Sequence, residues 1–152
     1  MKRFLLGLDI GGSKCAVVLG SLENQGQRIA ILAQTRFATA AFPAPQDCLA
    51  QLCRLAAGLL QAQQLSQDDL AGIGISCGGP LDSRQGLICS PPNLPGWDEV
   101  PVREFLAQHF SCSCPVYLQN DANAGALAEW HWGAGQGCRN MLFLTFGTGL
   151  GA

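Results

Sequence analysis

Short apolar runs divide the first forty residues of the chain into segments of strand length. The runs extend over Lys2 to Asp9, Cys15 to Ser21 and Arg28 to Phe37, and they are separated by Gly11-Gly12 and by residues 24–27. Apolar and β-branched runs between tight turns favour consecutive hairpins. The pattern therefore predicts a meander of three strands at the start of the chain.

Helical and strand-like patterns alternate after this meander. Leucines at three- and four-residue spacing predict an amphipathic helix that ends near Gln64, with Asp47 as its N-cap and one face on the sheet. Further segments follow: a strand at 71–76, an extended piece at 87–89, a proline-stiffened loop at 90–97, a helix at 102–110, a strand at 116–119, a helix at 122–132 capped by Asp121, and a strand at 141–146. Three hairpin strands followed by alternating helices and strands predict an α/β fold with a mixed sheet.

Composition restricts the classes of function. With 152 residues, 48% of them hydrophobic, the chain can bury the core of one domain, or of one domain and part of another. A net charge of -2 argues against a nucleic-acid partner, which would require a basic stripe. The first apolar stretch is interrupted at Asp9, which makes it too short for a signal peptide or a membrane span. We therefore expect a cytoplasmic protein that acts on a small molecule.

Eight cysteines would suggest a disulfide framework in a small secreted chain. Here five of them lie in apolar runs, at positions 15, 48, 53, 77 and 89, and no secretion signal accompanies them. We interpret most of them as reduced, buried thiols, because free cysteine behaves as a small hydrophobe. Cys112-Ser113-Cys114 offers half of a metal site as an alternative, without the second ligand pair of the usual four-ligand pattern.

Two glycine-bearing turns each follow an apolar run: Asp9-Ile10-Gly11-Gly12-Ser13-Lys14 and Gly147-Thr148-Gly149-Leu150-Gly151-Ala152. Because glycine lets backbone amides approach phosphate oxygens closely, the two turns suggest a pair of phosphate-binding loops. An ordinary Gly-Gly hairpin is the alternative for the first turn. The glycine spacing fits neither a Walker loop nor a dinucleotide fingerprint, and no helix is predicted after Lys14.

Three further residues are candidates for chemistry. Asp121, at a strand-to-helix junction beside Asn120, is either a general base that accepts a proton from a substrate hydroxyl or a plain N-cap. Asn93 offers a donor and an acceptor for a polyol from the proline-stiffened loop, with a turn asparagine as the alternative. Trp97 is favoured as a core residue over a stacking platform for sugar.

Taken together and in this order, the motifs resemble the ROK family of sugar kinases. The resemblance runs the length of the chain and rests on residues 8–14, 72–82, 92–97, 120–124 and 146–151. It implies an actin-like, ribonuclease-H-like ATPase fold of two lobes, with ATP and a hexose or related sugar meeting between them. These residues would form the N-terminal lobe (1–118) and a truncated start of the second lobe (119–152).

The resemblance also implies site roles. Asp121 would be the catalytic base, and Asp9 would lie close to Mg2+ through the phosphates. The phosphates themselves would be held by Gly11, Gly12, Ser13, Lys14, Gly147, Thr148 and Gly149, and the sugar by Gly78, Gly79, Asn93, Asn120 and Asp121. Relatives commonly form homodimers, so the same partner is implied here.

The family normally continues with a further sugar-binding segment, a cysteine-rich zinc motif and adenine-binding helices. The resemblance therefore places any structural zinc outside these 152 residues, and we expect little or no kinase activity from them alone. The leading hypothesis is the N-terminal part of an ATP-dependent sugar kinase, and the alternative is a non-catalytic sugar-binding module. A repressor of the same family is disfavoured, because the first strand leaves no room for a DNA-binding helix-turn-helix ahead of it.

Overall fold

The computed structural model describes residues 3–110, 114–146 and 150–151. Within them the regular elements are β1 (Arg3–Ile10), β2 (Lys14–Glu23), β3 (Arg28–Ala38), α1 (Pro45–Ala62), β4 (Leu70–Cys77), β5 (Leu81–Asp82), β6 (Leu87–Ile88), α2 (Val102–His109), β7 (Val116–Asn120), α3 (Asp121–Trp132), β8 (Thr145–Phe146) and β9 (Leu150–Gly151). The predicted alternation of helices and strands after the third strand is confirmed.

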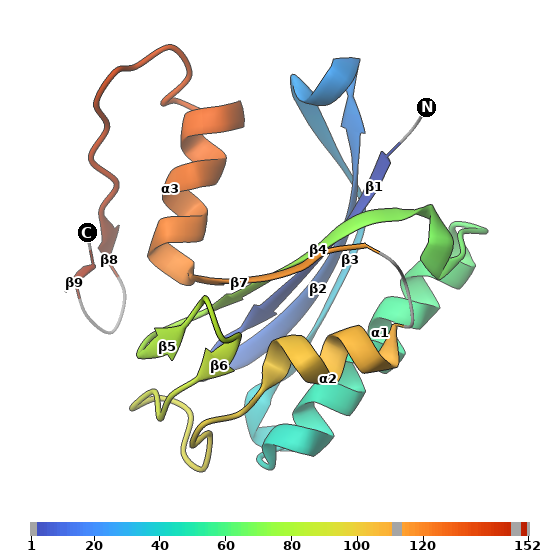
Figure 1. Cartoon of the computed structure of the whole chain (residues 1–152), viewed down its shortest axis with the longest axis vertical. Helices are drawn as coiled ribbons and strands as arrows, with labels where there is room; N and C mark the ends of the chain where they lie inside the picture. Colours follow the sequence, from blue (N-terminus) through green and yellow to red (C-terminus); the bar gives the residue numbers. More distant parts are fainter. Residues whose placement is uncertain (1–2, 111–113, 147–149, 152) are drawn as a thin grey trace.

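The central sheet has five strands in the order β3-β2-β1-β4-β7 (Figure 1). β1 pairs antiparallel with β2, and β2 pairs antiparallel with β3, which confirms the predicted meander. β4 then adds parallel to β1, and β7 adds parallel to β4, each reached through a segment that contains a helix. The sheet is therefore mixed, as expected from the order of elements.

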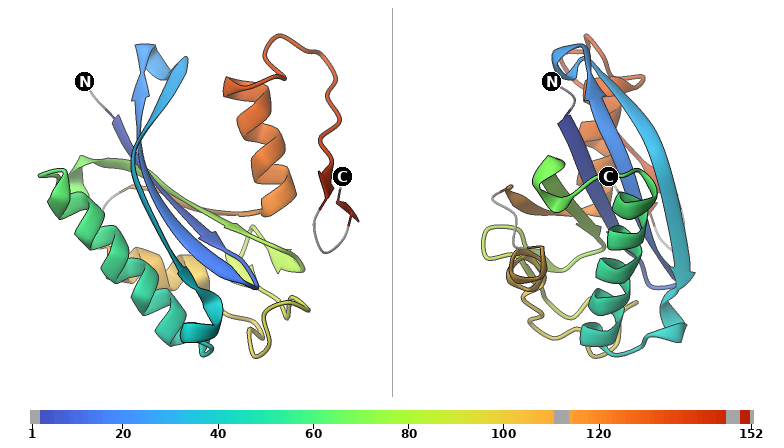
Figure 2. Two further views of the ribbon diagram at one scale, coloured as in Figure 1. Left: turned by 180° about the vertical axis from the view of Figure 1, so that it is seen from behind. Right: turned by 90° about the vertical axis from the view of Figure 1, so that its right-hand side faces the viewer.

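One face of this sheet carries the hydrophobic core. Leu6, Leu8 and Ile10 of β1 are at most 2% exposed, because alternate side chains of a strand point to the same face. Both α1 and α2 lie on this side of the sheet (Figure 2). Leu49 and Leu52 of α1 are buried against it, so the amphipathic face of the helix meets the sheet as predicted.

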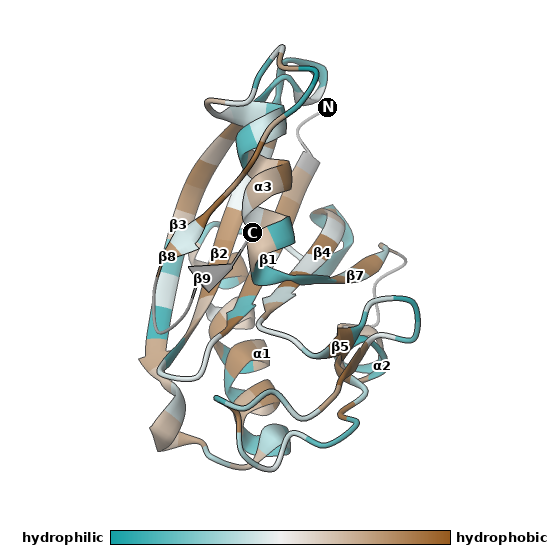
Figure 3. Cartoon of the chain, turned by 90° about the vertical axis from the view of Figure 1, so that its left-hand side faces the viewer, coloured by the Kyte–Doolittle hydropathy of each residue, from teal (hydrophilic) through white to brown (hydrophobic). Residues whose placement is uncertain are grey.

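The opposite face of the sheet is only partly covered. α3 lies on that side, and Figure 3 views the molecule from there. No residue of α3 is buried, although Trp132 Nε1 donates a hydrogen bond to the Gly26 carbonyl at 3.0 Å. An open groove of about 400 Å³ has an almost wholly apolar lining that includes Leu5, Val18 and Tyr117. This face is therefore an apolar surface beside α3.

The start of α1 differs from the prediction. The helix begins at Pro45 with Ala44 as its N-cap, and Asp47 lies inside the first turn rather than before it. Proline suits the first helical position because it has no amide hydrogen to satisfy there. Asp47 still places a negative charge at the positive end of the helix dipole.

The predicted strand at 141–146 is also shorter than expected. Only Thr145–Phe146 is a strand, and it pairs with Leu150–Gly151. The preceding residues run beside α3, and the Phe143 ring lies so close to Gly125 that a Cβ there would be 2.9 Å from it. Leu142 is 76% exposed, so this apolar run is not a buried strand.

The cysteines of the described residues are free thiols, and Cys15, Cys48, Cys53 and Cys77 are buried, as predicted. The same part of the chain contains no cluster of three or more metal-binding side chains, and Cys112 lies outside it. None of the helices α1 to α3 is both long enough and apolar enough to cross a membrane.

Candidate functional site

The parallel strands of the sheet end at one level. The register aligns Ile10 with Cys77 and Cys77 with Asn120, which are the last residues of β1, β4 and β7. The residues that follow them, including Gly11 and Asp121, therefore leave the sheet side by side. Ligands of open α/β sheets bind at such carboxyl ends, so this edge is the candidate site.

The loop after β1 is held in place by a neighbouring hydroxyl. Gly11 N donates to the Lys14 carbonyl at 3.2 Å, which closes the turn. The Gly11 carbonyl accepts a hydrogen bond from Thr39 Oγ1 at 2.7 Å, and Thr39 N donates to the Ser13 carbonyl at 3.1 Å. Ser13 and Lys14 are exposed and available to a ligand. The turn is a hairpin followed by a strand, as expected, and its backbone is fixed by Thr39.

Asn93 lies directly against this loop. A Cβ at Gly12 would lie 2.6 Å from the Asn93 carbonyl oxygen and 3.0 Å from its Nδ2. A Cβ at Gly78 would lie 3.8 Å from the same Nδ2. Asn93 therefore sits between the ends of β1 and β4, and only glycine at position 12 leaves space for it.

The loop that carries Asn93 is closed at its base. Ser90 N donates to the Trp97 carbonyl at 2.8 Å, and Leu94 N donates to the Pro91 carbonyl at 2.9 Å. Trp97 is 1% exposed, which confirms it as a core residue rather than a stacking platform. Its burial anchors the loop and so positions Asn93 at the edge of the sheet.

Asp121 is the first residue of α3, and its predicted role as the N-cap is wrong. Asn120 is the N-cap instead, because its Oδ1 accepts hydrogen bonds from the amides of Ala122 at 3.0 Å and Asn123 at 3.3 Å. Asp121 Oδ1 accepts from the Ala122 amide at 2.8 Å. The side chain of Asp121 is exposed, and its Oδ2 lies 3.9 Å from the position of a Cβ at Gly78.

The Asn120 side chain faces a second glycine of the same edge. A Cβ at Gly79 would lie 3.6 Å from Asn120 Nδ2. The structure thus brings together five predicted sugar and catalytic positions from three segments of the chain: Gly78, Gly79, Asn93, Asn120 and Asp121. Of the predicted phosphate-binding residues, Gly147, Thr148 and Gly149 lie outside the described residues.

A second carboxylate, that of Asp9, lies at the same end of the sheet. Asp9 Oδ1 accepts a hydrogen bond from Ser76 Oγ at 2.6 Å across the parallel pair β1 and β4. The side chain is exposed, and carboxylate oxygens are suitable ligands for Mg2+. Burial first, and then the charges of Asp121 and Asp9, raise the pKa of Cys77 to about 12. Both carboxylates are thus close enough to act electrostatically on one thiol.

Three residues of this edge were not predicted from the sequence. Thr39 fixes the Gly11 carbonyl, Ser76 orients Asp9, and Gln119 accepts a hydrogen bond from the Asn120 amide at 2.8 Å. Ser76 lies opposite Asp9 because of the register between β1 and β4. Thr39 contacts Gly11 although the two are 28 residues apart in the sequence, and no local pattern indicates this contact. A polar residue at the end of an otherwise apolar strand was the one available signal for Ser76 and Gln119.

The ROK family model matches residues 5–152 of the chain. The glucokinase of Thermotoga maritima is 33% identical over 150 residues, which cover 99% of this chain and 44% of that protein. A putative xylose repressor of Caldicellulosiruptor sp. is 28% identical over 148 residues, covering 97% of this chain and 35% of the repressor.

Among solved structures, the ROK hexokinase from Thermus thermophilus superposes with a TM-score of 0.76 at 34% identity, covering 99% of this chain and 45% of the hexokinase. The chain therefore spans less than half the length of these relatives. The α/β fold is the actin-like ATPase fold that the resemblance implied. Since the family model covers nearly every residue, the chain belongs to the ROK family.

Proposed function

We propose that these residues form the N-terminal part of an ATP-dependent sugar kinase, with residues 1–118 as one lobe and 119–152 as the start of a second. The observation that carries the proposal is the convergence of Gly12, Asn93 and Asp121 at the carboxyl ends of three parallel strands. Glucokinase and hexokinase relatives support sugar phosphorylation in general.

In this proposal Asp121 accepts the proton of the sugar hydroxyl that attacks the γ-phosphate. One of its carboxylate oxygens is occupied by the Ala122 amide, and Oδ2 faces Gly78, where the absence of a side chain leaves room for substrate. A general base must lie within hydrogen-bonding reach of the proton that it accepts. The hydrogen bond that Asp121 accepts from the Ala122 amide holds the carboxylate in place.

The remaining side chains of the edge bind and orient the two substrates. Asn93 and Asn120, with the backbone at Gly78 and Gly79, are proposed to hold sugar hydroxyls, because carboxamides offer both a donor and an acceptor. Phosphates are proposed to lie on the loop of Gly11, Gly12, Ser13 and Lys14, with Gly147, Thr148 and Gly149 as the opposing loop.

The exposed carboxylate of Asp9 at the end of β1 is a suitable ligand for a magnesium ion that would be held with the phosphates. Asp9 would hold it on the carboxylate oxygen that Ser76 does not engage. When bound, Mg2+ neutralises the charge on the phosphate oxygens. The hydrogen bond from the Ser76 hydroxyl orients the Asp9 carboxylate.

The test is D121N in the complete kinase, assayed for phosphoryl transfer and, separately, for sugar affinity. Loss of a positioned general base lowers turnover by about 10² to 10⁴-fold, and sugar binding is expected to remain within a few-fold. D68N is the matched control, because Asp68 is an exposed carboxylate in the short turn before β4, away from the site edge. Full turnover in D121N with unchanged sugar binding would refute the assignment of the base.

A second candidate function is sugar binding without catalysis. It is favoured by the repressor relative, which matches nearly the whole of this chain. Titration of the 152-residue chain with hexoses and with ATP, followed by a transfer assay of the complete protein, separates the two. Sugar affinity without transfer by the complete protein would favour the binding module, whereas the kinase proposal expects transfer by the complete protein and none by these residues alone. We further propose that the complete protein is cytoplasmic and forms a homodimer.

A further inference from the structure

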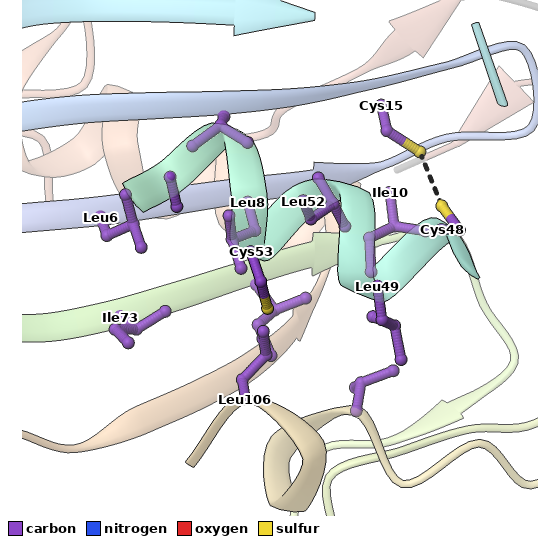
Figure 4. Close-up of a cluster of buried hydrophobic side chains, with 14 of the residues drawn as sticks. Leu6, Leu8, Ile10, Cys15, Cys48, Leu49, Leu52, Cys53, Ile73 and Leu106 are labelled. Carbon is purple, nitrogen blue, oxygen red and sulfur yellow. Dashed lines mark hydrogen bonds between the residues drawn. The ribbon is translucent and has the colours of Figure 1, made fainter. Parts of the chain in front are cut away.

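Two thiols meet in the core beneath the loop that follows β1. Cys15 Sγ and Cys48 Sγ are 3.7 Å apart, and both residues are 0% exposed (Figure 4). Cys15 is the second residue of β2, directly after the loop, and Cys48 lies in the first turn of α1. The pair thus joins two elements that are 33 residues apart in sequence.

Hydrogen bonds make the two sulfurs unequal. Thr39 Oγ1 lies 3.4 Å from Cys15 Sγ, and it also donates a hydrogen bond to the Gly11 carbonyl at 2.7 Å. The Cys48 thiol, with its sulfur 3.7 Å from Cys15 Sγ, can donate a hydrogen bond to the Cys15 thiolate. This hydrogen bond is the largest cause that lowers the pKa of Cys15, to about 7, and burial opposes it. The same contact, together with burial, raises the pKa of Cys48.

Other buried thiols of the described residues lack such a partner. Cys53 is also 0% exposed, but within residues 3–110 and 114–146 no other sulfur lies within hydrogen-bonding distance of its thiol. Burial raises its pKa to about 12. Thiolate is the reactive form of cysteine, so ionisation singles out Cys15, and the short distance between the sulfurs singles out Cys48 as its partner. Cys53 provides a natural control.

We propose that Cys15 and Cys48 form a redox-active pair, which a peroxide converts to an intramolecular disulfide between the start of β2 and the first turn of α1. This inference concerns the core beneath the site and does not depend on the proposed kinase activity. Intracellular disulfides of this kind are usually transient and sensing rather than structural.

The chemistry needs only hydrogen peroxide as the oxidant. The Cys15 thiolate attacks one oxygen, the O–O bond breaks, and the departing hydroxide takes up the proton that Cys15 released, forming water and the Cys15 sulfenic acid. The sulfur of Cys48 then attacks the sulfenic sulfur, the S–O bond breaks, and the oxygen leaves with the Cys48 proton as a second water. Two thiols lose two electrons in total, and one peroxide becomes two waters.

Forming the bond shortens the distance between the sulfurs from 3.7 Å to about 2.0 Å. Cys15 also loses its hydrogen, and with it the contact of its Sγ with the Gly11 carbonyl at 3.9 Å. The start of β2, directly after the loop, is then joined to α1 by a covalent bond instead of by a hydrogen bond between two thiols. Because both sulfurs are buried, peroxide must enter through a local opening of the first turn of α1.

The test is native oxidation of the chain with a small excess of hydrogen peroxide, followed by alkylation after unfolding and peptide mapping. The expected product is a peptide pair that joins Cys15 to Cys48 and is sensitive to reductant. C48S should give no such pair, and Cys15 should instead be trapped by a sulfenic-acid reagent such as dimedone. C53S should form the same disulfide as the wild-type chain.

Two results would overturn the inference. One is recovery of both Cys15 and Cys48 as alkylated thiols while Cys138, which is exposed, is already oxidised. The other is a Cys15 to Cys48 bond that appears only when oxidation is carried out in denaturant, because the pairing would then owe nothing to the folded structure. Both readouts are independent of sugar or ATP binding, so they stand apart from any failure of the kinase proposal.

Discussion

Gly12→Ala should disturb the site through a single methyl group. The added Cβ would lie 2.6 Å from the Asn93 carbonyl oxygen and 2.8 Å from the Asn93 Cβ. Ordinary contacts are about 3.5 Å or longer, so one of the two backbones must move by about 0.9 Å. Asn93 cannot yield easily, because its loop is closed by the Ser90 to Trp97 hydrogen bond and anchored by a buried indole.

Overpacking of this kind costs about 1 to 3 kcal/mol. We therefore expect G12A to lower the free energy of unfolding of the chain by that amount, measured by urea denaturation. If the strain is relieved by displacing Asn93, sugar affinity falls as well, by about 5- to 150-fold for the same 1 to 3 kcal/mol. Titration with the preferred sugar measures this second effect.

Gly58→Ala is the matched control for G12A. Gly58 lies on the exposed side of α1, and a Cβ there meets no atom within 4 Å. The same chemical change should stabilise the protein by about 1 kcal/mol, since alanine is the better helix former. Opposite signs at the two glycines are the signature of the packing argument. A G12A chain as stable as the wild type would refute it.

Further predictions concern the core, a helix cap and a turn. W97A removes an indole that is 1% exposed and should destabilise the chain by about 3 to 5 kcal/mol in urea denaturation; a loss below about 1 kcal/mol would contradict its role as the anchor of the loop. N120A removes the side-chain acceptor of the Asn123 amide at a cost of about 1 kcal/mol, so this amide should exchange hydrogen about five-fold faster, whereas N120D should keep it protected; the Ala122 amide retains Asp121 as an acceptor. Asp69 accepts hydrogen bonds from Ser66 N and Oγ, which lower its pKa in the folded state. Its stabilisation is therefore present above the unfolded pKa of about 3.9 and lost as the pH falls through the lower folded value, so the stability difference between wild type and D69A should vanish in acid and persist at pH 7.

Local patterns in the sequence were sufficient to predict the strands β1 to β4 and β7 of the central sheet, the helices α1 to α3 and their order. The meander and α1 rest on tight turns and on leucine spacing, which act over a few residues. The start of α1 was missed because proline at the first helical position shifted the boundary ahead of Asp47. At α3, Asn120 and Asp121 are both good caps, and the sequence alone does not rank two such neighbours.

The shortened last strand has a different origin. Residues 141–144 are apolar enough for a strand, but a strand also needs a neighbour that supplies hydrogen bonds. Among the described residues, only Leu150–Gly151 pairs with this segment, and it reaches no further than Thr145–Phe146. Composition indicates the tendency of a segment, whereas pairing depends on the rest of the fold.

Contacts between segments that are distant in the sequence could not be predicted from it. Asn93 was a candidate because of its loop, but its position against Gly12 depends on the pairing of β1 with β4 and on the burial of Trp97. The approach of Cys48 to Cys15 likewise depends on how α1 crosses the sheet (Figure 4). Such distances are set by packing, and no spacing in the sequence encodes them.

The Ser90–Trp97 loop begins and ends at one hydrogen-bonded base. A segment closed in this way can exchange the residues between its ends while the strands on either side stay where they are. Within the family, changes of sugar preference would then accumulate in this loop, on a sheet edge that keeps the carboxylate of Asp121 in the same place. Transfer of this loop alone from one relative to another would then be expected to transfer the sugar preference with it.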